Sequence, residues 1–340
     1  MKFPFDPEFP QKNADDAYLH ELKDLPVKPV FIMGLHRSGT TFLYDSVSKC
    51  FPVANLSLYH LFYFHRLMKN HNEGLESKYR EVLNTLLRGL GITDRKIDAV
   101  YVDDKMVEEY GWMLRNESYH ISMHESNKDY FKEICQKLLY VNPGAKSVLL
   151  KNPWDTANAS DILKWFPEAK FIYITRDPIY ILNSQINAAL DLMSGTQPFQ
   201  TMLLDNFKMP GGKVTMTAVY AVWKLVRGIK KVMGNGLYGF IIKQFMQQNL
   251  IVDLAGYYRA IEELPEASVY QLTYGSFNKD PVGKLKEIQA FLDLPFDDAP
   301  ESIKPKPRKG QLAEHLQKYE PKLMKKLEKK IGHSAAVDLD

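Results

Sequence analysis

The stretch GLHRSGTT, residues 34–41, decides the fold of this chain because it joins an apolar run to a helical pattern. The run VFIM at 30–33 is typical of a buried strand, and residues 39–51 carry apolar side chains at nearly helical spacing. Its two glycines let the backbone curl so that N–H groups point inward, and the helix adds the positive end of its dipole. The alternative is an ordinary strand-to-helix turn, but four side chains stand where phosphate ligands belong: Arg37, Ser38, Thr40 and Thr41. We therefore predict a phosphate-binding loop of the P-loop type.

The loop differs from that of nucleoside triphosphatases at one position that bears on the chemistry. Those loops place a lysine after the second glycine, where it neutralises the β- and γ-phosphates, and this chain has Thr40 there. The later apolar run FIYIT, residues 171–175, leads into Arg176 and not into an aspartate suited to a metal ion. We therefore expect an anionic nucleotide held by cationic side chains without a metal, which disfavours ATP or GTP hydrolysis.

Strand and helix patterns alternate along the rest of the chain. Further buried strands are expected at 148–150, 171–175 and 269–273. Helices are expected at 58–92, 104–115, 128–140, 160–166 and 178–192. This alternation predicts an α/β fold of three α/β/α layers with a central parallel sheet. Because no linker divides the chain, we predict a single domain over 1–340, with an N-terminal arm at 1–26 and helical insertions at about 55–145 and 190–260.

Two later segments could bind a second anion. Arg176 follows a predicted strand, where ligands of open α/β sheets bind, and Ser184 lies about two turns into the next helix. Taken alone, an arginine after a strand is more often part of a structural ion pair. The sequence KPKPRKG contains the third element, which could close over phosphate or be a solvated charged loop; its members are Arg308, Lys309 and Gly310.

Composition excludes several classes of protein. The 340 residues are 45% hydrophobic and 25% charged, the balance of a globular chain. The net charge of +3 is too small to indicate nucleic-acid binding. No apolar run reaches the roughly 18 residues that span a bilayer, and the acidic, proline-containing N-terminus differs from a signal peptide. We therefore expect a cytoplasmic protein without an integral membrane segment, whose two cysteines are reduced thiols.

The order of the three anion-binding elements resembles the PAPS-dependent sulfotransferase family, where PAPS is 3′-phosphoadenosine 5′-phosphosulfate. GLHRSGTTF is similar to the family's 5′-phosphosulfate loop, RDPIYILNS to its 3′-phosphate motif, and RKG to the C-terminal 3′-phosphate loop of its cytosolic members. Two longer stretches also resemble the family: LLKNPWDTANASDILKWFPEAKFIYITRDP and VYQLTYGSFNKDPVGKLKEIQAFLDLPF. The resemblance covers both ends of the catalytic core, and the two insertions match less clearly.

The resemblance implies a set of donor-binding residues. For the 5′-phosphosulfate they are Arg37, Ser38, Gly39, Thr40 and Thr41, with His36 in the same loop facing the nucleotide. Phe42 stands where cytosolic members often carry a tryptophan against adenine, and Tyr274 would complete the pocket. For the 3′-phosphate the residues are Arg176, Ser184, Arg308, Lys309 and Gly310.

The implied reaction is in-line transfer of a sulfuryl group from PAPS to a hydroxyl or amine of a small-molecule, lipid or carbohydrate acceptor. Fixed cations would stabilise the transition state, and we assign this role first to Arg37 and then to Lys151. Cytosolic family members place a histidine two residues after the lysine, whereas this chain has Pro153. The general base must therefore come from elsewhere, and the candidates are His60, Glu109 and Asp155.

Aromatic residues near His60 bear on the acceptor. Tyr59, Phe62, Tyr63 and Phe64 could line a pocket for a hydrophobic alcohol or phenol, or could pack in the core. Two other functions stay open from the sequence. One is a nucleotide or small-molecule kinase, which would need magnesium. The other is a PAPS-binding module that has lost its base, an alternative that Pro153 leaves open.

Overall fold

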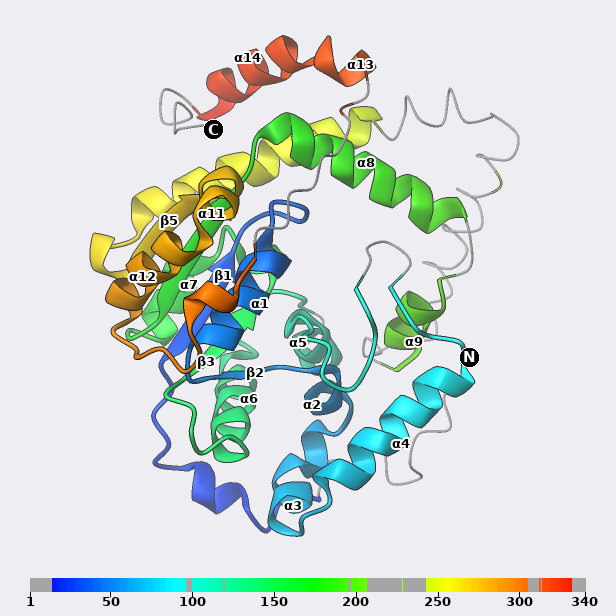
Figure 1. Ribbon diagram of the computed structural model, residues 1–340, viewed down its shortest axis with the longest axis vertical. Helices are drawn as coiled ribbons and strands as arrows, with labels where there is room; N and C mark the ends of the chain where they lie inside the picture. The colour runs from blue at the N-terminus through cyan, green and yellow to red at the C-terminus, as the bar shows by residue number, and fades with distance from the viewer. Residues whose placement is uncertain are drawn as a thin grey trace. The chain divides into compact units, whose positions relative to one another are not determined.

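The computed structural model describes residues 14–95, 100–118, 120–194, 197–206, 228, 243–304, 312 and 314–331 (Figure 1). The described contacts group into two compact units. Unit 1 contains the described parts of Met1–Pro29, Val53–Leu150 and Gly195–Val219. Unit 2 contains the described parts of Val30–Pro52, Lys151–Ser194 and Tyr220–Asp340. The single domain over 1–340 stays a prediction.

One parallel sheet of five strands forms the centre of the fold. Its strands are β1 (Pro29–Met33), β2 (Val53–Asn55), β3 (Ser147–Lys151), β4 (Lys170–Thr175) and β5 (Val269–Thr273). Their order is β2-β3-β1-β4-β5. With helices on both sides, the sheet confirms the predicted three-layer α/β/α class. Four strands lie where the apolar runs predicted them, whereas β2 was missed because it has only three residues, two of them half-buried.

The helices are mostly short, and several coincide with the predicted ones. The α-helices are α1 (Thr40–Cys50), α2 (Leu58–Phe62), α3 (Leu67–Asn72), α4 (Glu76–Gly89), α5 (Gly111–Ser118), α6 (Lys128–Tyr140), α7 (Ala159–Trp165), α8 (Pro178–Ser194), α9 (Pro198–Asn206), α11 (Tyr274–Lys279), α12 (Pro281–Leu292), α13 (Glu314–Gln317) and α14 (Glu320–Ile331). The 3-10 helices are η1 (Leu19–Leu22), η2 (Phe64–Arg66), η3 (Pro153–Asp155), η4 (Glu266–Ser268) and η5 (Pro300–Ser302). Residues 243–263 are also helical.

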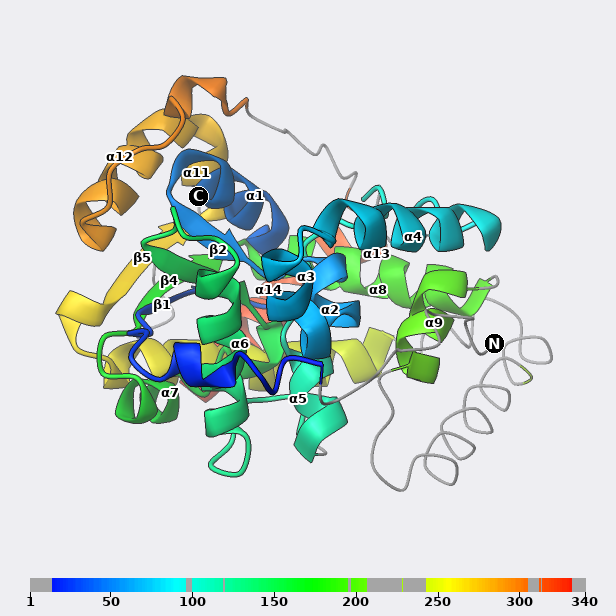
Figure 2. The same cartoon turned by 90° about the horizontal axis from the view of Figure 1, so that it is seen from below.

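In unit 2, β1, β4 and β5 bring three loops to one edge of the sheet. The parallel register pairs Met33 with Tyr173, and Tyr173 with Gln271, so the carboxyl ends of these strands lie together. Helices α1, α11 and α12 cover one face of these strands and α7 covers the other (Figure 2). The strands are held by apolar packing, such as the stacked rings of Phe31 and Phe171 at 5.4 Å. This arrangement places the segments after β1, β4 and β5 side by side.

In unit 1, the described part of the N-terminal arm is folded against helices. Asp15 accepts a hydrogen bond from the Lys69 backbone and pairs with the buried ammonium of Lys137 at 3.0 Å. Gln136 donates to the carbonyl of Leu22, which lies in η1. A buried charge must be paired to be tolerated, so the Asp15–Lys137 pair fixes where the arm packs.

The prediction of a helix over 104–115 is wrong for its first half, because helix α5 begins only at Gly111. Residues before it pair with residues 56–59 in an antiparallel manner: the N–H of Leu58 donates to the Met106 carbonyl, and that of Glu108 to the Leu56 carbonyl. These long-range bonds compete with the helical ones, and no local propensity predicts them.

Two features predicted from composition can be compared with the described part of the chain. Among the described residues, no helix combines the length and the apolar character that crossing a membrane requires. Cys50 and Cys135 are both free and buried.

Candidate functional site

The loop after β1 has an unusual backbone. Arg37 has a φ of 77°, which residues with a side chain seldom adopt, and Gly39 has a φ of 106°. Gly39 is also the N-cap of α1 and supplies no side-chain cap to the first amides of that helix. Strained residues cost about 1–3 kcal/mol and gather at functional sites. The loop therefore leaves the positive end of α1 available to an anion.

A hydroxyl from a distant segment holds the start of this loop. The N–H of Gly34 donates to Oγ1 of Thr156 at 3.2 Å, and the same hydroxyl donates to the Gly34 carbonyl at 3.1 Å. A Cβ at Gly34 would lie 2.5 Å from the Ile174 carbonyl oxygen, so no larger residue fits there. Ser38, expected as a phosphate ligand, is buried and donates its hydroxyl to the Leu35 carbonyl at 2.8 Å. The loop is thus held by its own hydrogen bonds and by Thr156 in the turn after β3.

Cationic and hydroxyl groups from separate motifs meet beside the loop. Nε of Arg37 donates to Oγ of Ser184, in α8, at 2.8 Å. Nζ of Lys151, at the end of β3, lies 3.5 Å from Oγ1 of Thr41. Lys151 is only 6% exposed, which is rare for a lysine without a binding or pairing role. Two of the motifs singled out in the sequence, 147 residues apart, are therefore in direct contact.

Aromatic rings close the other side of the loop. The ring of Tyr274, at the start of α11, packs on Gly39, since a Cβ there would lie 2.4 Å from its Cδ2. The guanidinium of Arg176 lies 4.9 Å from the centre of the same ring. Phe42 packs against Phe277 at 5.1 Å between ring centres. Arg176 and Tyr274 therefore lie side by side, as expected of residues that follow neighbouring parallel strands.

The turn after β3 contains Asp155, one of the three candidate bases. Asp155 is fully buried, and its two carboxylate oxygens accept hydrogen bonds from Asn152 at 2.9 Å and Asn158 at 3.1 Å. Its backbone N–H donates to the Asn152 carbonyl. These bonds hold the turn together, so the geometry favours a structural role for Asp155 over proton transfer.

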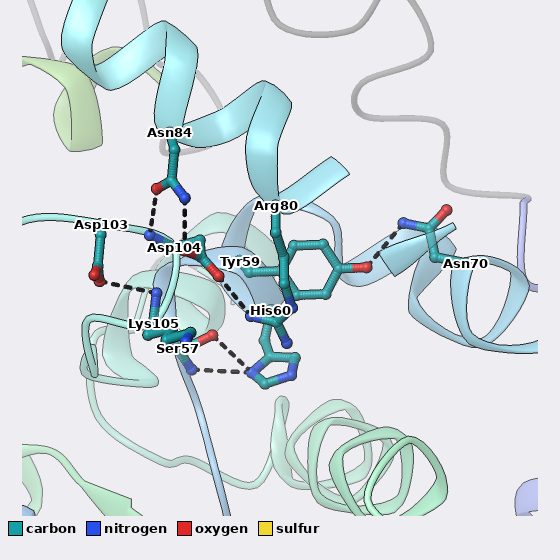
Figure 3. A network of polar contacts seen from close by, with 9 residues as sticks. All are labelled: Ser57, Tyr59, His60, Asn70, Arg80, Asn84, Asp103, Asp104 and Lys105. Atoms are coloured by element: carbon teal, nitrogen blue, oxygen red, sulfur yellow. Dashed lines mark hydrogen bonds and ion pairs between the residues drawn. The ribbon is translucent and has the colours of Figure 1, made fainter. Parts of the chain in front are cut away.

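His60, in unit 1, is part of the cap of α2 (Figure 3). Its Nδ1 accepts a hydrogen bond from the Ser57 backbone at 3.1 Å and lies 3.0 Å from the Ser57 hydroxyl. Burial, reinforced by the positive charge of Arg80, lowers the pKa of His60 to about 3. The ring is therefore neutral at physiological pH and a weak proton acceptor as it stands.

A polar network surrounds His60 in unit 1 (Figure 3). Arg80 pairs with Asp104 at 2.9 Å and lies over the ring of Tyr59 at 4.1 Å. Asn84 bonds to both the carboxylate and the backbone N–H of Asp104. The network holds the extended segment that leads to Glu109, the remaining candidate base. Glu109 is half-buried, and its backbone N–H donates to the Glu108 carboxylate at 3.2 Å.

The aromatic residues near His60 are buried and pack against one another. Tyr59, Phe62, Tyr63 and Phe64 are each at most 2% exposed. Tyr59 and Tyr63 pack with ring centres 5.3 Å apart. This burial favours the core interpretation of the cluster, and the acceptor pocket stays a prediction. The predicted ligands Arg308, Lys309 and Gly310 lie outside the described residues.

Unit 2 brings several groups that can bind anions to one edge of the sheet. The N-terminal end of α1 and the guanidinium of Arg37 lie in one loop, and the guanidinium of Arg176 lies beyond Tyr274. Because residue 39 is a glycine, no Cβ lies between the loop and the ring of Tyr274. Arginine and helix-terminal amides are the donors that phosphate and sulfate prefer. The fold and this edge define a three-layer α/β/α protein with anion-binding groups at the carboxyl ends of its strands.

The family model described as "Sulfotransferase family" matches residues 29–209, more than half of the 340-residue chain. The chain belongs to the sulfotransferase family, as the resemblance of its motifs predicted. Comparison with curated proteins gives no match.

Two solved structures share the fold. Sulfotransferase STF9 from Mycobacterium avium has a TM-score of 0.63 and 16% identity, over 96% of this chain and 82% of that one. Sulfotransferase STF1 from Mycobacterium tuberculosis H37Rv has a TM-score of 0.59 and 16% identity, over 94% of this chain and 80% of that one. At this identity the similarity concerns the fold.

Sequence reasoning missed the residues that hold the site in place. Thr156 forms hydrogen bonds with Gly34, 122 residues away in the loop after β1. Asn152 donates to the Asp155 carboxylate and so holds the buried turn that carries Thr156. The motif KNPWDTAN contained one signal, since Asn, Asp and Thr around a proline are typical of a hydrogen-bonded turn. Only the fold shows that the turn and the loop are joined.

Proposed function

We propose that the protein transfers a sulfuryl group from PAPS to a hydroxyl or amine of its acceptor. The observation that carries the proposal is the contact between Arg37 and Ser184, which joins the loop after β1 to the helix after β4. In the family these two motifs bind opposite ends of one donor nucleotide. Membership of the sulfotransferase family supports the reaction class.

The donor would lie along the carboxyl edge of unit 2. The loop amides, Arg37 and Thr41 would hold the 5′-phosphosulfate, while Arg176 and Ser184 would hold the 3′-phosphate. Phe42 and Tyr274 supply aromatic surface beside the loop. Arg308, Lys309 and Gly310 would add donors to the 3′-phosphate. PAPS supplies a sulfuryl group joined to its 5′-phosphate by one S–O bond.

Arg37 and Lys151 would stabilise the charge that develops during transfer. The bond from Nε to Ser184 fixes the orientation of the Arg37 guanidinium without using its terminal donors. Lys151, buried and 3.5 Å from Thr41, places a second positive charge beside the loop. Preorganised cations of this kind act without reorganisation as the S–O bond to the phosphate breaks and the bond to the acceptor forms. No step assigned to these residues needs a metal ion, which we propose is absent from the reaction.

The acceptor also loses a proton, and Glu109 is our first choice for the base. His60 is the weaker candidate, because its pKa is lowered to about 3 and its Nδ1 is already bonded to Ser57. His60 would then support the segment that carries Glu109. Glu109→Gln should reduce turnover by about 10²–10⁴-fold, the range for a lost general base. A smaller effect of Glu109→Gln than of His60→Gln would return the role to His60.

Transfer of labelled sulfate from PAPS in the presence of EDTA tests the reaction. Arg37→Ala should lower kcat by about 10²–10³-fold, the usual cost of one transition-state donor. Lys49→Ala is the matched control, because Lys49 is an exposed cation of α1 that pairs with Asp45 and should leave turnover within twofold. Activity that requires magnesium and ATP would identify a kinase instead. Nucleotide binding without transfer to any acceptor would identify a binding module.

A further inference from the structure

Trp154 is one of the few large aromatic side chains among the described residues that are largely exposed. It is 54% exposed, in the short helix η3 that follows β3. Tryptophan is usually well buried, because leaving its large apolar surface in water is unfavourable. An exposed tryptophan beside a site of chemistry is therefore a candidate for ligand contact.

The turn that carries Trp154 is rigid. Asn152 and Asp155, on either side of it, are both 0% exposed and bonded to each other through side chain and backbone. Pro153 further restricts the backbone at the first position of η3. The next residue, Thr156, bonds to Gly34 of the phosphate-binding loop. The exposed ring is thus presented by a turn whose polar groups are directed inward.

Trp154 also lies close to the residues assigned to transfer. Lys151 is three residues before it, at the end of β3. The ring of His36, in the loop, meets the Trp154 ring edge-on with centres 5.2 Å apart and an interplanar angle of 70°. His36 is itself exposed. The two rings form an aromatic corner beside the loop, in the turn that directly follows Lys151.

We infer that Trp154 is a specificity-determining residue that stacks on a planar aromatic ring of the acceptor, so that a phenol is the substrate class. This inference rests on the proposed function. A flat ring beside an edge-on imidazole suits stacking, and rigid presentation limits the entropy lost on binding. The side chains of Asn152 and Asp155 are buried, so they offer no hydrogen-bond partner to a sugar at this turn.

Calorimetric titration of 2-naphthol into the full-length protein saturated with adenosine 3′,5′-bisphosphate (PAP) tests the inference. We expect binding by the wild type, at least tenfold weaker binding by Trp154→Ala, and near-complete recovery with Trp154→Phe. Trp165→Phe is the matched control, because Trp165 ends α7, just before the amino end of β4, and should bind like the wild type. Cyclohexanol, which is not planar, should bind Trp154→Ala and wild type within twofold of each other.

The outcomes separate the inference from the function on which it rests. If PAP itself does not bind, the proposed function fails. If PAP binds but 2-naphthol does not, or if Trp154→Ala binds it as tightly as the wild type, the inference is wrong and the function stands. Preference for a glycoside over 2-naphthol, lost in Trp154→Ala, would assign the tryptophan to a sugar and would also overturn the phenol class.

Discussion

Arg37 illustrates how single residues carry this site. The loop pattern predicted that its side chain is a phosphate ligand, and the resemblance to the family implied binding of the donor. Its backbone φ of 77° and its bond to Ser184, 147 residues away, were not predictable from the motif. The residue type followed from the motif, and its orientation followed from the tertiary fold.

At the residue scale, the lowered pKa of His60 predicts how the free energy of unfolding depends on pH. Its pKa is about 3 in the folded chain, against 6.5 when unfolded, because burial disfavours the charged ring. Between these values only the unfolded chain binds the proton. The contribution of neutral His60 to the free energy of unfolding is therefore full above pH 6.5 and declines as the pH falls toward 3. From pH 7.5 to pH 5 the loss should be about 2 kcal/mol, because the slope approaches about 1.4 kcal/mol per pH unit below pH 6.5.

Urea unfolding at pH 7.5 and pH 5 measures this loss. His60→Gln keeps a polar side chain at a cap position that favours glutamine, and should remove most of the pH dependence. His124→Gln, at an exposed histidine, should retain the wild-type dependence. An unchanged pH dependence in His60→Gln would show that other groups cause it.

At the scale of elements, the turn η3 and the loop after β1 act as one unit through Thr156. The buried N–H of Gly34 loses its partner in Thr156→Val, which keeps the shape of the side chain but not its hydroxyl. Leaving such a donor unpaired costs about 1–3 kcal/mol. Thr156→Val should lower the free energy of unfolding by that amount and weaken PAP binding, whereas Thr156→Ser should behave as the wild type. Unfolding curves measure the first effect and calorimetry the second; equal stability of all three proteins would contradict the coupling.

The elements that the sequence predicted well are those with strong local patterns. The apolar runs at β1, β3, β4 and β5 and the helical repeat of α6 each specify their own structure. Strand β2 is too short for a pattern, and the segment before α5 is extended because of pairing with residues 56–59. The candidate base His60 was chosen from its residue type, whereas its burial and low pKa depend on neighbours such as Arg80.

At the scale of the whole molecule, motifs from distant parts of the chain are combined by the parallel sheet. The carboxyl ends of β1, β4 and β5 bring together Gly39, Arg176 and Tyr274. The parallel topology predicted that these segments share an edge. Which donors contact one another depended on helix placement and side-chain packing, which the motifs do not encode.

Calorimetric titration with PAP in EDTA tests the central claim most directly. The account predicts that PAP binds with one site per chain, that Arg37→Ala and Arg176→Ala each weaken this binding, and that Mg·ATP does not compete. Failure to bind PAP, together with uptake of Mg·ATP, would contradict it.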